Sequence, residues 1–138
     1  MQVFHYTFSS PLQAENIDLG TIEGERMVSY FLDYPWADWL LKMEGVKEGD
    51  IYFSPTLNFE NKETKQKILV SAVGDRAGFV FYVFYQRPIM VNHFFGLRQK
   101  YKEDHTTEVL HQSKEKTALL VEAFAKGNNT YLEEEIKY

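Results

Sequence analysis

A run of seven residues from Phe79 to Tyr85 is apolar, β-branched or aromatic at every position. Alternate residues of a strand point to opposite faces of a sheet, so a strand of this composition has no face suited to water. We therefore expect this strand near the centre of a sheet, with helices on one face and another layer or a partner on the other. The run indicates a fold class and no activity, because burying both faces is a packing requirement.

The whole chain, residues 1–138, reads as a single α+β domain, since its length suits one hydrophobic core. Period-two patterns and polar turns predict an antiparallel sheet of about five to six strands, with a meander over 51–87 at its centre. Further strands are expected at 3–8, 19–23, 27–32 and 106–111. Residues 89–97 fit either a short helix or an apolar loop.

Helical patterns occur at three places. Trp36, Trp39, Leu40 and Met43 follow the spacing i, i+3, i+4, i+7, which predicts a helix near 35–44. Ser113 suits the N-cap of a helix near 113–126. A capping-box pattern, Thr130 to Glu133, predicts a last short helix near 130–137. We expect all three helices to pack on the sheet.

Composition narrows the chemistry. The chain has no cysteine, which removes disulfides, thiolate metal sites and cysteine nucleophiles. His105 and His111 are six residues apart and cannot share an ion on one strand or one helix, so we expect no metal and no cofactor. The net charge of −5 opposes nucleic-acid binding. The sequence contains no apolar stretch of about 18 residues, so we predict no membrane-spanning helix. We expect a soluble, cytoplasmic protein.

Two groups of residues are candidate binding sites. The stretch near 90–97 is apolar without a helix to bury it, which favours a partner-binding or dimer surface made of Met90, Phe94, Phe95 and Leu97. Tyrosines are abundant, and five of them lie on or beside predicted strands, where their hydroxyls could line a ligand cleft. These are Tyr30, Tyr34, Tyr52, Tyr82 and Tyr85.

Three functions remain open. The first is a non-catalytic interaction or inhibitor-type module that acts through an acidic surface and the apolar 90–97 patch, by binding another protein or a second copy. The second is a small-molecule-binding domain with a tyrosine-lined cleft. The third is an enzyme with a dispersed Asp/Glu/His/Tyr site. We favour the first, without catalysis, because the chain has no nucleophile elbow and no phosphate-binding loop.

Overall fold

The computed structural model describes the backbone of residues 2–93 and 98–137 and the side chains of residues 2–90 and 101–137. The strands are β1 (Val3–Ser9), β2 (Ile17–Glu23), β3 (Thr56–Asn61), β4 (Gln66–Asp75), β5 (Gly78–His93) and β6 (Arg98–Gln112). The helices are α1 (Gly24–Asp33), α2 (Trp36–Glu44), α3 (Lys114–Ala125) and α4 (Asn129–Glu135), with a short 3₁₀ turn η1 (Glu48–Asp50).

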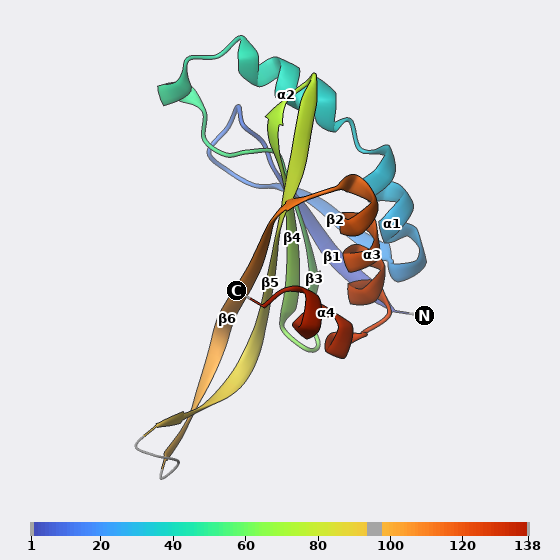
Figure 1. The fold of residues 1–138 in the computed structure, drawn as a ribbon, viewed down its shortest axis with the longest axis vertical. Coiled ribbons are helices and arrows are strands. Elements are labelled where there is room, and N and C mark those ends of the chain that lie inside the picture. The colour runs from blue at the N-terminus through green and yellow to red at the C-terminus, as the bar shows by residue number, and fades with distance from the viewer. Residues whose placement is uncertain (1, 94–97, 138) are drawn as a thin grey trace.

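The six strands form one antiparallel sheet in the order β2-β1-β3-β4-β5-β6, which confirms the predicted α+β class (Figure 1). The meander β3-β4-β5 occupies the middle of this order, and β5 lies next to the edge strand β6. None of the helices in the described residues combines the length and the apolar character needed to cross a membrane.

The helices pack on one face of the sheet (Figure 1). The side chains of β5 that they bury are those at odd positions, Phe81, Val83 and Tyr85, each fully buried. The Phe81 ring lies 5.0 Å from that of Phe31 on α1 and 5.3 Å from that of Trp36 on α2. The same face of β1, β3 and β4 completes the core with Phe4, Phe8, Leu57, Phe59, Ile68, Val70 and Ala72.

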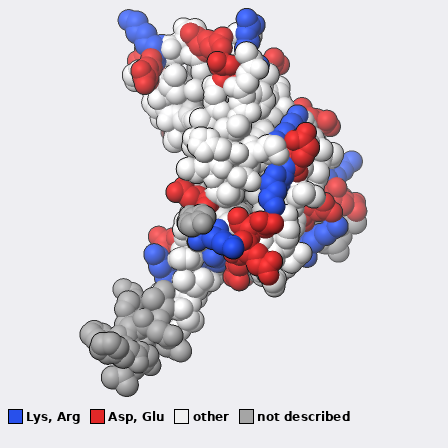
Figure 2. Space-filling model, in the orientation of Figure 1, with Lys and Arg blue, Asp and Glu red and all other residues white. Residues whose placement is uncertain are grey.

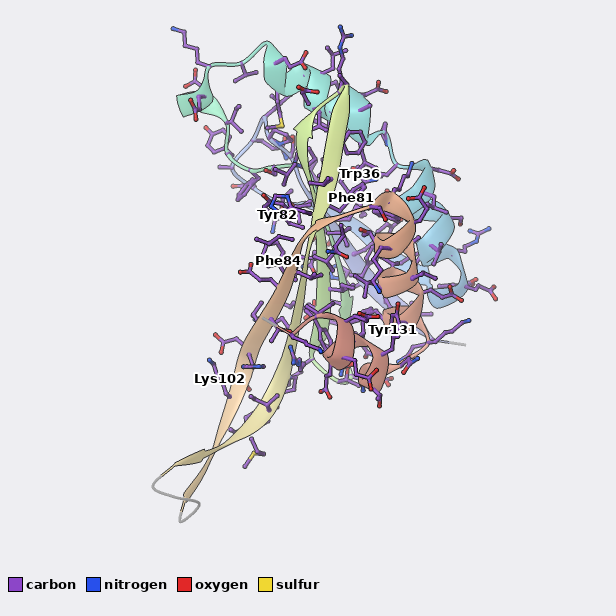
Figure 3. All side chains as sticks on the ribbon, in the orientation of Figure 1. Trp36, Phe81, Tyr82, Phe84, Lys102 and Tyr131 are labelled. Carbon is purple, nitrogen blue, oxygen red and sulfur yellow. The ribbon has the colours of Figure 1, made fainter. Side chains whose placement is uncertain are left out.

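The expectation that the Phe79–Tyr85 run is dry on both faces is wrong. Tyr82 and Phe84 are only half-buried, and Figure 3 shows them on the side opposite Phe81 and Trp36. Alternation does place their side chains on a common face, as the sequence indicates. No described helix lies over that face, where the side chains of Tyr82 and Phe84 are partly exposed (Figure 1).

The segment 27–32 forms part of helix α1, not a strand. Met27, Tyr30, Phe31 and Tyr34 fall at i, i+3, i+4 and i+7, and Met27 and Phe31 are fully buried. The stripe becomes visible only when Tyr34 is included, beyond the end of the predicted strand. Helix packing against α3 and the sheet then outweighs the strand preference of the local residues.

Residues 89–93 are neither helix nor loop, because β5 continues through them to His93. Beyond Gln86, β5 has no partner in β4 and pairs only with β6, so the two strands project from the sheet as a hairpin arm (Figure 1). Pro88 is compatible with this, since a strand without a neighbour on one side needs no donor there. The buried Arg87 anchors the arm, donating to Tyr85 O and to Thr107 Oγ1 at 2.6 Å.

Element boundaries differ from prediction at two other places. The strand expected from residue 51 begins at Thr56, where pairing with β1 and β4 starts. Asn128, and not Thr130, caps α4, because its Oδ1 accepts from the N–H of Tyr131 at 3.3 Å. The Ser113 cap is confirmed, with Oγ accepting from the N–H of Lys116.

One-sided burial predicts unequal costs for removing adjacent rings. Phe81→Ala leaves a cavity in the core and should lower the free energy of unfolding by about 3–5 kcal/mol. Phe84→Ala removes a half-buried ring and should cost about 1 kcal/mol. Urea unfolding of both variants measures the difference, and equal losses would contradict the assignment of the two faces.

Candidate functional site

The open face of the sheet carries an apolar stripe on β4 and β5. We call this stripe the open-face patch: Leu69, Val73, Val80, Tyr82 and Phe84. Leu69 is the cross-strand partner of Phe84, and Val73 is the partner of Val80. All five side chains are half-buried. Contiguous apolar side chains on an uncovered face are a mark of binding surfaces.

Acidic residues flank the open-face patch on both sides. Glu108 on β6 is the cross-strand partner of Phe84. On the other side, His5 Nε2 lies 2.9 Å from Asp18 Oδ1, and His5 Nδ1 lies 4.0 Å from Glu60 Oε1. In the view of Figure 2 charged groups of both signs gather along the top edge and near the start of the arm, and the surface between these two places is largely uncharged.

Asp18 is held in its charged form. The backbone N–H of Gly20 donates to its Oδ1 at 2.8 Å, and this bond, followed by the contact with His5, lowers the pKa of Asp18 below its ordinary value. Among the described residues, no group of three or more His, Asp or Glu side chains is placed to hold a metal ion. Lys62 Nζ lies 3.8 Å from Glu60 Oε1, and Lys67 is the cross-strand partner of Glu60, so this edge of the open face carries mixed charge.

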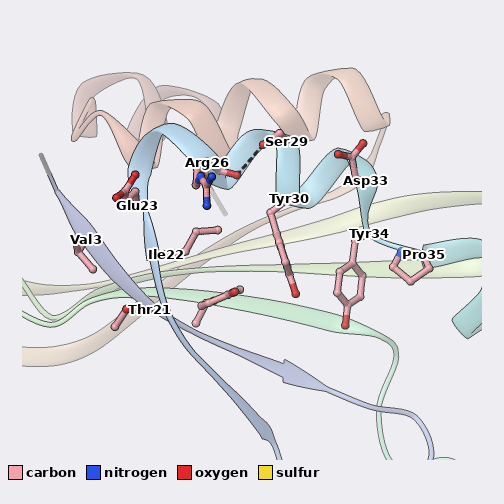
Figure 4. Close-up of a pocket in the computed structure, with 11 residues that line it drawn as sticks. Val3, Thr21, Ile22, Glu23, Arg26, Ser29, Tyr30, Asp33, Tyr34 and Pro35 are labelled. Carbon is pink, nitrogen blue, oxygen red and sulfur yellow. Dashed lines mark hydrogen bonds between the residues drawn. The ribbon is translucent and has the colours of Figure 1, made fainter.

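A pocket of about 860 Å³ lies on the helix side of the sheet, between α1 and the β1–β2 hairpin (Figure 4). We call it the α1 pocket. Its aromatic wall is made by Tyr6, Tyr30 and Tyr34, with the Tyr6 and Tyr30 rings edge-on at 5.1 Å and those of Tyr30 and Tyr34 5.5 Å apart. Its other lining residues are Val3, Thr21, Ile22, Glu23, Arg26, Ser29, Asp33 and Pro35.

The five tyrosines predicted to form a cleft do not share one. Tyr30 and Tyr34 line the α1 pocket, and Tyr82 belongs to the open-face patch. Tyr52 is exposed in the segment before β3, whereas Tyr85 is buried in the core with its hydroxyl 3.3 Å from Asn129 Oδ1. Burial raises the pKa of Tyr85. Of the five, only Tyr30 and Tyr34 line the same pocket, and the other three lie at three separate places.

Of the predicted partner-binding residues, Met90 lies on the arm and is 55% exposed, opposite the exposed Tyr101. Phe94, Phe95 and Leu97 lie outside the described residues. Sequence reasoning missed Phe84 as a surface residue and Arg26 and Tyr6 as pocket residues. Arg26 and Tyr30 are four residues apart, which makes them neighbours on the surface of a helix but not on a strand. The predicted strand at 27–32 therefore hid this relation.

No protein-family model matches this chain, and neither a curated protein nor a solved structure does.

The geometry at Asp18 predicts a measurable pKa. The carboxyl should titrate below 3.8 in the folded protein, and His5→Gln should raise its pKa by removing one of the two stabilising contacts. Because the folded-state pKa is lowered, this contact stabilises the fold above the unfolded pKa and is lost as the pH falls through the folded one.

Carbon-detected NMR titration of the Asp18 carboxyl measures the value, with Asp50 as a reference on the surface. A pKa at or above 3.8 in the wild type would show that the described hydrogen bonds do not form in solution.

Proposed function

We propose that this protein is a non-catalytic interaction module that binds a basic partner protein through the open-face patch. The observation that carries the proposal is that a strand apolar on both faces is covered by helices on one face only. Partner binding supplies the second layer that such a strand requires. Met90, the one residue of the expected 90–97 surface with a described side chain, is exposed on the arm opposite Tyr101, and we include both in the proposed interface.

Charge supports a basic partner over a second copy. The patch itself carries no charge. Glu108 lies on one flank, and on the other Asp18 and Glu60 lie beside Lys62 and Lys67, so the preference for a basic partner rests mainly on the net charge of the chain. The chain as a whole has a net charge of −5. Two copies would bring like charges together at the rim, whereas a partner with an apolar centre and a cationic rim would be complementary at both. A chain without cysteine needs no oxidising compartment, and we propose the cytoplasm as its location.

Site-specific photo-crosslinking tests this proposal. A benzoylphenylalanine residue placed at position 84 should crosslink a basic protein in native cell extract. The yield should fall as salt is raised, because salt screens the charges at the rim. The same group at position 119, where Leu119 is 52% exposed on α3, serves as the matched control and should give no such product.

Equal yields of the crosslinked product from positions 84 and 119 would show that the partner does not bind specifically at the open-face patch. A second copy of the chain or an acidic protein crosslinked from position 84, or no product at all, would contradict the proposed partner.

A further inference from the structure

The α1 pocket is lined by one exposed cation, Arg26, and by two acidic residues, Glu23 and Asp33. Arg26 extends from α1 into the space beside Ile22 (Figure 4). No ion pair within 4.0 Å among the described residues involves its guanidinium. A guanidinium presents a planar set of donors that matches a carboxylate at two points.

The acidic residues of the pocket leave its centre to Arg26. Glu23 precedes the first residue of α1 and Asp33 is its last. In Figure 4 the Asp33 carboxyl lies on the far side of the helix from the Tyr34 ring, and the Arg26 side chain hangs between these two ends toward the sheet. The position facing the aromatic wall is therefore cationic.

The aromatic wall supplies further donors. The hydroxyls of Tyr30 and Tyr34 are protonated at neutral pH, as tyrosine hydroxyls ordinarily are, and can donate hydrogen bonds. Figure 4 shows both rings pointing from α1 toward the sheet. The Tyr6 and Tyr30 rings touch each other edge-on, so together they form a wall against which a flat apolar group can pack.

We propose that the α1 pocket binds a small anion with a flat apolar body, an aromatic carboxylate, which Arg26 holds by its charged end and Tyr6 and Tyr30 hold by its ring. The site goes beyond the proposed partner interaction, because it lies on the helix side of the sheet and uses none of the open-face patch. The two can therefore be tested and can fail separately.

Three probes of the same shape test the ligand class. Benzoate, benzamide and benzylamine carry a negative, a neutral and a positive group on one ring. In amide-detected NMR titrations of the full chain, benzoate should shift resonances of α1 and of the β1–β2 hairpin. It should bind about tenfold or more tightly than benzamide, as expected for one charge-assisted contact. Benzylamine should bind most weakly.

Arg26→Gln should remove the preference for benzoate over benzamide. Arg76→Gln is the matched control, since it makes the same charge change in the exposed turn between β4 and β5, and it should leave the preference intact. Thermal unfolding of both variants verifies that each remains folded.

Several outcomes would overturn the site: no shift with benzoate, shifts confined to another surface, equal binding of benzoate and benzamide, or an identical response of the two arginine variants. Tight binding of benzylamine would reverse the assigned charge and would also overturn it. None of these results bears on crosslinking from position 84.

Discussion

Burial of one sheet face under four helices is the constraint on which this structure depends. Side chains of a strand alternate, so Phe81, Val83 and Tyr85 can enter the core only if Tyr82 and Phe84 leave it. The packing of Phe81 against rings from α1 and α2 fixes the sheet beneath these helices. Trp36 of α2 is itself tied to α1, because its indole N–H donates to Phe31 O at 3.0 Å.

That constraint also determines where binding surfaces are available. Helices that use one face leave an apolar stripe on the other, with charged residues on its flanks. The helix side keeps a separate opening where α1 leaves the β1–β2 hairpin, lined by tyrosines and Arg26. The two surfaces lie on opposite sides of one sheet, so a partner and a small ligand need not compete for space.

Much of the fold is predictable because its signals are local. Helix α2 and the Ser113 cap of α3 follow from spacing and capping alone, and polar turns delimit the β3-β4-β5 meander. Helix α1 cannot be predicted in this way, because its apolar stripe is recognisable only when Tyr34, beyond the apolar segment 27–32, is included. The candidate sites are less predictable, because alternation identifies two faces of β5 without saying which one the helices cover. The contact between Tyr6 on β1 and Tyr30 on α1 also cannot be predicted from sequence spacing, because it forms only in the tertiary structure.

The central claim is that adjacent residues of β5 experience different surroundings, and cysteine labelling tests it directly. The chain has no cysteine, so Val83→Cys and Phe84→Cys each introduce a single thiol. With purified protein at low concentration, the thiol at position 84 should react with a soluble disulfide reagent far faster than the thiol at position 83, which should react only as the chain unfolds. Equal protection at the two positions would contradict a sheet covered on one face.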